Sequence, residues 1–151
     1  MIGKYLNKIG LNSKTASKKL NQVNIRRRNK VLETYIKNLS KNKNKIIKEN
    51  LKDIYACKRE DLIDRLKIDE NTIEKIRSSI YQIAKFKDPL GKIIEKWKRP
   101  NKLIIKKITI PIGVIGVIYE SRPNVTCDVS SLCLKSGNVA ILRGGSESFN
   151  S

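Results

Sequence analysis

The sequence of 151 residues contains no histidine. Without an imidazole, the chain cannot build a zinc site with a histidine ligand, a Ser–His or Cys–His nucleophile pair, or an imidazole acid or base. Its three cysteines are scattered and include no Cys-x-x-Cys pair: Cys57, Cys127 and Cys133. Because an odd, scattered set does not make a disulfide framework, we expect a reducing, cytoplasmic setting and no metal site.

Long apolar runs are also lacking. The N-terminus, Met-Ile-Gly-Lys-Tyr, does not have the apolar stretch of a signal peptide. The longest uncharged stretch extends from Ile108 to Tyr119 and contains a proline and two glycines. Since a membrane-spanning helix needs about 20 apolar residues, we expect no membrane association.

Acidic residues are scarce, and the formal net charge is +19. Clustered Lys and Arg can bind a phosphate backbone, so a basic nucleic-acid-binding module is one hypothesis. Lys, Asn and Ile together make up 61 of the 151 residues, however, and all three have A/T-rich codons. The excess charge also lies entirely within residues 1–110, whereas residues 111–151 carry three basic and three acidic groups. We therefore expect no specific nucleic-acid partner.

Residues 12–86 show helical periodicity. Asn24 can cap a helix with one apolar face, and Asp69 can cap another. The Lys/Asn run at 41–45 separates the first of these from a middle helix. The expected inward residues are Val31, Leu32, Tyr35, Ile36 and Leu39, then Ile46, Ile47, Leu51, Ile54 and Tyr55, then Ile73, Ile76, Ile80 and Ile83.

The pattern changes after the turn at residues 88–91. Two short apolar runs, 93–94 and 103–105, flank Pro100-Asn101 and predict a β-hairpin. Residues 112–119 are apolar on both faces and predict a buried strand. A helix over 126–136, stopped by Gly137, and a short buried strand over 139–142 would complete a βαβ unit with parallel strands. The predicted fold class is α/β.

Two loops follow these strands at the edge where open α/β sheets bind ligands. In the second loop along the chain, Arg143-Gly144-Gly145-Ser146-Glu147, the glycines let the backbone approach an anion and Arg143 can pair with a phosphate or a ribose hydroxyl. The alternative is an ordinary surface turn. In the first loop along the chain, Tyr119-Glu120-Ser121-Arg122-Pro123-Asn124, Asn124 can donate to an oxyanion and Arg122 can hold an anionic substrate group. The alternative is that Pro123-Asn124 starts a helix while Glu120 and Arg122 neutralise each other.

The thiols are weaker candidates. Cys133 lies on an apolar helix face, which is typical of core packing. Cys127 falls in a first helical turn, where a thiolate can be stabilised, but no adjacent base would activate it. Cys57 lies in a charged linker.

The segment IPIGVIGVIYESRPNVTCDVSSLCLKSGNVAILRGGSE, residues 110–147, strongly resembles the gamma-glutamyl phosphate reductase family of the aldehyde dehydrogenase superfamily. The segments NKVLE, DRL and DPLG resemble further family motifs in the same order. The resemblance implies an enzyme that reduces L-glutamate 5-phosphate to L-glutamate 5-semialdehyde with NADPH and releases phosphate, in proline biosynthesis. It also implies a Rossmann-like fold and a homo-oligomer assembled through the hairpin.

The resemblance divides the chain into an N-terminal helical part (1–92), an oligomerisation-type hairpin (93–110) and the start of the cofactor-binding sheet (111–151). It implies that Arg143, Gly144, Gly145, Ser146 and Glu147 bind the adenosine ribose and its 2′-phosphate, and that Tyr119, Glu120 and Ser121 line the nicotinamide end. Asn124 would support the oxyanion, and Arg122 would bind substrate. Family enzymes are more than twice this long and their nucleophilic Cys lies in a later block, so we expect these 151 residues alone to be inactive. A structural module that only oligomerises is the remaining alternative.

Overall fold

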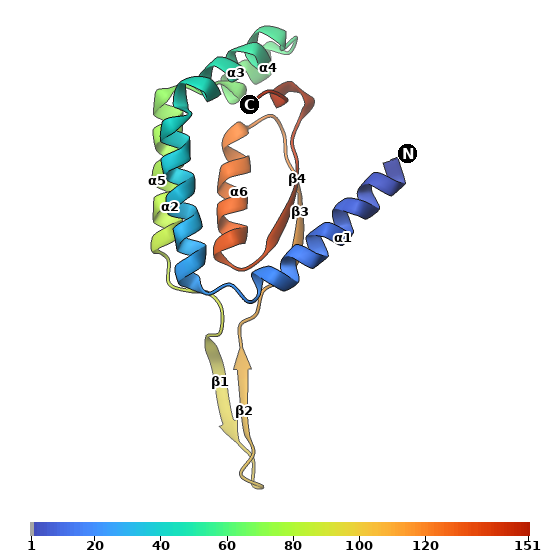
Figure 1. Cartoon of the computed structure of the whole chain (residues 1–151), viewed down its shortest axis with the longest axis vertical. Helices are drawn as coiled ribbons and strands as arrows, with labels where there is room; N and C mark the ends of the chain where they lie inside the picture. Colours follow the sequence, from blue (N-terminus) through green and yellow to red (C-terminus); the bar gives the residue numbers. More distant parts are fainter. Residues whose placement is uncertain (1) are drawn as a thin grey trace.

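Five helices form the first part of the chain in a computed structural model that describes residues 2–151 (Figure 1). They are α1 (Ile2–Leu20), α2 (Ile25–Lys41), α3 (Lys43–Ala56), α4 (Glu60–Leu66) and α5 (Glu70–Lys85). Asn24 caps α2 by accepting from the Arg27 amide at 3.0 Å, and Asp69 caps α5 by accepting from the Thr72 amide at 2.7 Å. Both predicted caps are confirmed. Helix α1 begins ten residues earlier than the predicted helical region.

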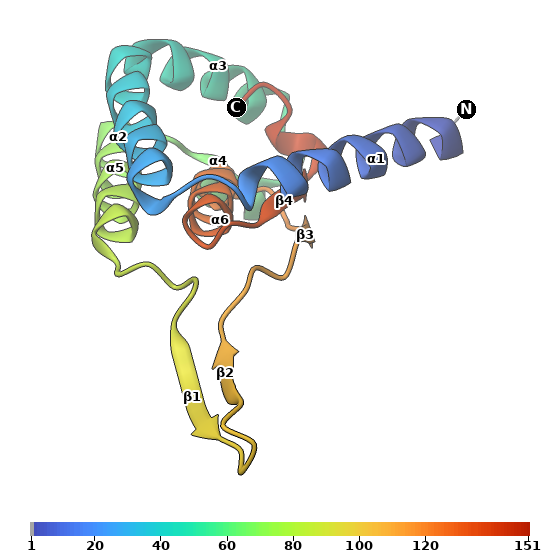
Figure 2. The ribbon, with the colours of Figure 1, turned by 60° about the horizontal axis from the view of Figure 1, so that its bottom comes forward.

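Two separate pairs of strands follow. The hairpin strands β1 (Ile93–Lys98) and β2 (Ile104–Ile108) are antiparallel and project away from the helices (Figures 1 and 2). Strands β3 (Val114–Ile118) and β4 (Val139–Arg143) are parallel and are joined by α6 (Pro123–Lys135). A one-turn 3-10 helix, η1 (Ser146–Ser148), follows β4. The α/β class, the hairpin and the βαβ unit are therefore confirmed.

The core lies between α2 and α5, which run side by side, with α6 packed against both (Figure 1). Its buried members come from α2 and α5: Leu32, Leu39, Ile76, Ile80 and Ile83. Because these residues recur every three to seven positions, they form one stripe along each helix. Val31, which we expected on the same face of α2, is 52 % exposed.

Helix α3 departs from the prediction along most of its length, although Ile46 packs against the core as expected. Its buried residues are Asn50 and Asp53, whereas Leu51 and Tyr55 are 43 % and 84 % exposed. Polar groups can be buried when hydrogen bonds satisfy them, and both of these side chains are bonded. Three of the apolar residues of α3, Ile47, Leu51 and Ile54, instead line a surface groove.

Strand β3 is half open, which corrects the expectation of a buried strand. Its alternate residues Val114 and Ile118 are exposed, as is the preceding Ile112, and Ile118 is 87 % exposed. One face meets the rest of the chain, while no element among residues 2–151 covers the other. Strand β4 is half-buried along most of its length.

A buried polar cluster joins the hairpin base to the helices. The Arg28 guanidinium donates to both carboxylate oxygens of Asp88, at 3.0 and 2.8 Å, and to the Lys135 carbonyl. The Lys135 ammonium donates to the Asn29 side chain and to the Ala84 carbonyl, each at 2.7 Å. Burial lowers the pKa of Lys135. These contacts fix the end of α6 and the turn before β1 against α2.

Candidate functional site

The two candidate loops lie next to each other. Strands β3 and β4 pair in parallel from Val114–Val139 to Ile118–Arg143, so both chains leave the sheet at the same edge. The Tyr119 amide donates to the Arg143 carbonyl at 3.0 Å, which extends the pairing by one residue. Since ligands of open α/β sheets bind at the carboxyl ends of strands, this edge is the candidate cofactor site.

A hydrogen bond joins the two loops directly. The Ser121 hydroxyl, which is fully buried, donates to Glu147 Oε2 at 2.9 Å. The amide of Glu147 itself, followed by the Ser121 hydroxyl, lowers the pKa of the Glu147 carboxyl. Glu147 is therefore ionised at neutral pH and holds the second loop on the first.

The two glycines occupy places where the loops approach closely. A Cβ atom on Gly145 would lie 2.5 Å from Ser121 Oγ and 2.8 Å from Glu147 Oε2. One on Gly144 would lie 3.4 Å from the Tyr119 ring, whose hydroxyl in turn contacts Thr126 Oγ1 at 2.5 Å. The close approach at these glycines is thus to the neighbouring loop of the same chain.

The carboxylate and guanidinium of the first loop do not pair with each other, contrary to one of our alternatives. Glu120 instead binds Arg65 of α4, with Arg65 Nη1 donating to Glu120 Oε2 at 2.7 Å. Arg122 is exposed and precedes α6, whose first residue is Pro123. The prediction that Pro123-Asn124 starts a helix is confirmed.

Asn124 lies in the first turn of α6 and is half-buried. Its amide nitrogen is 3.5 Å from Asp128 Oδ2, while Asp128 Oδ1 accepts from the Ser79 hydroxyl at 2.9 Å. The long distance to Asp128 makes a weak bond, so the Asn124 amide keeps donor capacity for another acceptor.

Arg143 and Ser146 present polar groups at the outer side of the second loop. Both residues are exposed, and Arg143 Nη1 donates to the Gly144 carbonyl. A guanidinium carries five donors, so this single contact leaves most of them for a ligand.

The cysteines show no sign of activation. Burial raises the pKa of the Cys127 thiol, whose sulfur accepts from the Tyr35 hydroxyl at 2.9 Å. Cys133 is buried in the core, as predicted, and burial raises its pKa as well. A raised pKa removes thiolate at neutral pH, which argues against either residue as a nucleophile.

Sequence reasoning missed the contribution of the α3–α4 segment. A hollow of about 330 Å³ separates this segment from the second loop. It is lined on one side by Asp53, Ala56, Cys57, Lys58 and Arg59, and on the other by Ser146, Glu147, Phe149 and Asn150. No local pattern connects residues so far apart in the chain, so only the folded structure could reveal this neighbour.

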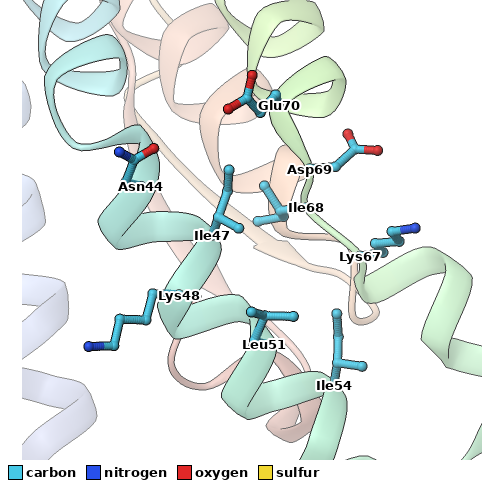
Figure 3. Close-up of a pocket in the computed structure, with 9 residues that line it drawn as sticks. All are labelled: Asn44, Ile47, Lys48, Leu51, Ile54, Lys67, Ile68, Asp69 and Glu70. Atoms are coloured by element: carbon cyan, nitrogen blue, oxygen red, sulfur yellow. The ribbon is translucent and has the colours of Figure 1, made fainter.

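A second hollow, of about 460 Å³, lies on the other face of α3 (Figure 3). Three aliphatic side chains of α3 form its floor, Ile47, Leu51 and Ile54, and Ile68 closes one side. Lys48, Lys67, Asp69 and Glu70 stand at its rim. The spacing of the α3 residues is what led us to expect them in the core, and they instead form an apolar groove at the surface.

Metal and membrane sites are not found among residues 2–151. No group of three or more Cys, Asp or Glu side chains in this range is arranged to hold a metal ion. The helices of the same range are all too short or too polar to span a bilayer.

Comparison with known proteins gives a consistent result. The gamma-glutamyl phosphate reductase of Caldanaerobacter subterraneus is 47 % identical over 143 residues, covering 92 % of this chain and 34 % of the relative. That of Clostridium tetani is 44 % identical over 153 residues, covering 99 % of this chain. This chain is a homologue of the N-terminal third of gamma-glutamyl phosphate reductase. No protein-family model matches it.

Solved structures of gamma-glutamyl phosphate reductase share the fold. The crystal structure from Thermotoga maritima matches 91 % of this chain with a TM-score of 0.88 and 35 % identity. The one from Saccharomyces cerevisiae matches 95 % with a TM-score of 0.90 and 31 % identity. The chain spans 34 % and 38 % of those two chains, so it corresponds to about one third of the known enzymes.

Proposed function

We propose that this chain provides the first part of the cofactor domain of an NADPH-dependent gamma-glutamyl phosphate reductase. In the overall reaction L-glutamate 5-phosphate, NADPH and a proton give L-glutamate 5-semialdehyde, inorganic phosphate and NADP⁺. This is a step of proline biosynthesis in the cytoplasm. The observation that carries the proposal is the 44 % identity to the Clostridium tetani relative over 99 % of the chain, which includes both loops at the sheet edge.

The polar groups at that edge fit a nicotinamide dinucleotide phosphate. Arg143 is exposed beside the backbone of Gly144 and Gly145, and a guanidinium can pair with a ribose hydroxyl or a 2′-phosphate. The hydroxyl of exposed Ser146 adds a donor next to them. When bound, NADPH would supply the hydride, and these residues would hold its adenosine half.

The first loop would serve the nicotinamide and substrate ends. Tyr119, Glu120 and Ser121 form the backbone turn there, and Ser121 holds it against Glu147. The Asn124 amide can donate to the oxyanion that develops on the acyl oxygen. Arg122, exposed beside it, can bind an anionic group of L-glutamate 5-phosphate.

The similarity to gamma-glutamyl phosphate reductases also suggests roles for the three parts of the chain. Residues 1–92 and 111–151 would build the Rossmann-like domain around β3 and β4, and residues 93–110 would support a homo-oligomer. The projecting hairpin exposes large apolar side chains, including Trp97 at 40 % and Leu103 at 56 %. Exposed apolar surface of this kind is typical of protein–protein contact.

Activity would require the catalytic cysteine, which the resemblance assigns to a later block than these 151 residues. Two proteins test this: the 151-residue chain, and a chimaera in which the remaining two thirds of the Clostridium tetani relative follow Ser151. The assay is phosphate-dependent reduction of NADP⁺ by L-glutamate 5-semialdehyde, the reverse reaction. We expect activity from the chimaera alone. Activity of the 151-residue chain would overturn its assignment as an inactive part, and a folded but inactive chimaera would overturn the proposed function.

A further inference from the structure

Asp53 of α3 is a buried carboxylate that binds a segment almost one hundred residues away. It is only 3 % exposed. Its Oδ1 accepts from the Asn150 amide at 3.0 Å and from the Asn150 side chain at 2.7 Å. Its Oδ2 accepts from the Asn150 amide at 3.1 Å, the Ser151 amide at 2.8 Å and the Ser151 hydroxyl at 2.6 Å.

None of the ion pairs within residues 2–151 includes Asp53, so its charge is balanced by hydrogen bonds. Burial alone would raise the pKa of this carboxyl, but the donors from Ser151 and Asn150 outweigh it and lower the pKa. A carboxylate that accepts several N–H and O–H donors is held in its ionised form.

The neighbouring residue Asn50 fixes the helix that carries Asp53. Asn50 is fully buried, and its amide donates to the Leu66 carbonyl at 2.8 Å while its Oδ1 accepts from the Ile68 amide at 2.7 Å. Its amide also lies 3.3 Å from the Ser151 hydroxyl. Helix α3 is therefore tied both to the end of α4 and to residues 150–151.

Residues 150–151, which Asp53 binds, directly follow the second loop of the candidate site. Residues 150–151 lie two positions after η1, which contains Glu147, and Glu147 binds Ser121 of the first loop at 2.9 Å. The first loop has its own tie to the same helical unit through Arg65 and Glu120. The α3–α4 unit thus contacts the first loop directly and the second loop through residues 150–151.

We propose that Asp53 is a positioning residue for the cofactor site: its carboxylate clasps residues 150–151 and thereby holds the 144–148 loop against the 119–122 loop. The effect on the cofactor rests on the function proposed above. The effect on the loops does not, and it can be measured without any cofactor.

Amide hydrogen exchange of the 151-residue chain tests the clasp, with Asp53→Asn as the main variant. An asparagine at this position keeps the shape but turns an N–H donor toward the Asn150 and Ser151 donors. We expect at least tenfold faster exchange over 144–148 and 119–122, with exchange in α2 and α5 unchanged. Asp64→Asn is the matched control, since Asp64 is an exposed carboxylate in α4. Acceleration confined to residues 149–151 would overturn the proposal.

If Asp53→Asn unfolds the whole chain, a second variant, Asn150→Ala, tests the same contact by changing its exposed partner. It removes one donor to Asp53 Oδ1. Faster exchange over 144–148 would support the proposal, and unchanged exchange there would overturn it. In the chimaera, Asp53→Asn should raise KM for NADP⁺ more than it lowers kcat. A lower kcat with an unchanged KM for NADP⁺ would assign Asp53 a purely structural role. Inactivity of the unmodified chimaera would contradict the proposed function instead.

Discussion

Gly145 and Ser121 approach so closely that a Cβ atom at position 145 would lie 2.5 Å from the Ser121 hydroxyl oxygen. The φ angle of Gly145 is −68°, which any L-residue adopts, so the backbone conformation does not require glycine here. The requirement is space between two loops that carry the candidate cofactor site.

Replacing Gly145 with alanine should therefore destabilise the loop pair by steric contact. We expect a loss of about 1–3 kcal/mol in the free energy of unfolding, measured by urea denaturation. Adding Ser121→Ala, which removes the clashing oxygen, should recover part of this loss in a double-mutant cycle. Gly10→Ala is the control: Gly10 lies within α1 with open space around it, so alanine should stabilise by about 0.5–1 kcal/mol. Additive effects of Gly145→Ala and Ser121→Ala would contradict the steric explanation.

The Arg28–Asp88 ion pair is the buried polar contact that should matter most for stability. The Arg28 side chain is 3 % exposed, and replacing it with methionine leaves the Asp88 carboxylate and the Lys135 carbonyl without their partner. The Asp88 side chain is 30 % exposed and keeps the Leu90 amide donor at 3.1 Å, so the loss should be smaller than the about 3–5 kcal/mol of a fully buried pair. Lys30→Met in the same helix removes a surface pair with Glu33 and should change stability by less than about 1 kcal/mol. Similar urea midpoints for the two variants would show that the Arg28 network contributes little.

The N-cap of α5 should make stability depend on pH at the acidic end. Hydrogen bonds from the Thr72 amide and then its hydroxyl lower the pKa of Asp69 in the folded state. The stabilisation is complete above the ordinary value of 3.8 and is lost as the pH falls through the folded value. Asp69→Asn keeps a capping oxygen, so its melting temperature should match the wild type at pH 7 and depend less on pH between 5 and 3. Asp69→Ala should melt lower at pH 7. An unchanged pH profile in Asp69→Asn would assign the acid sensitivity to other carboxyls.

Local signals in the sequence were enough for much of the fold. Asn24 and Asp69 each precede an apolar repeat, and both cap helices as expected. The hairpin and the βαβ unit follow from short apolar runs separated by turn residues, and parallel pairing then brings the loops after residues 118 and 143 to one edge. The position of the candidate site was therefore predictable, because the pairing of two adjacent parallel strands determines which loops meet.

The rest depends on contacts between distant residues. The buried residues of helix α1 are Ser13 and Ser17, so burial on this helix does not follow its apolar residues, and Gly3 and Gly10 lower its helix propensity. In α3 the apolar stripe faces a surface groove, while Asn50 and Asp53 are buried because partners up to 101 positions away satisfy them. Periodicity locates a stripe on a helix but does not say what covers it. The Arg65–Glu120 pair was hidden for the same reason.

Asn124 should affect turnover in the chimaera if its amide stabilises an oxyanion. Asn124→Ala should lower kcat about 100-fold or more while the KM for NADP⁺ stays near the wild-type value. The control is Asn71→Ala, an exposed residue in the first turn of α5, which should leave both constants unchanged. If Asn124→Ala instead lowers the melting temperature and kcat falls only with the folded fraction, its role is limited to the start of α6.

Arg143 should discriminate between the two nicotinamide cofactors in the same chimaera, because only NADPH and NADP⁺ carry a 2′-phosphate. The guanidinium is exposed at the end of β4, and the single bond to the Gly144 carbonyl leaves donors free for a second anionic partner. Losing a charge-assisted contact to phosphate costs about 1.5–3 kcal/mol, so Arg143→Ala should raise KM for NADP⁺ by roughly 10- to 100-fold and KM for NAD⁺ much less. Arg143→Lys keeps the charge but not the planar fork, and it should give an intermediate value.

Arg99→Ala, on the hairpin turn, removes an equal charge far from the site and should alter neither constant. Equal increases for both cofactors in Arg143→Ala would mean that Arg143 contacts a group common to the two cofactors, such as the adenosine ribose or the pyrophosphate.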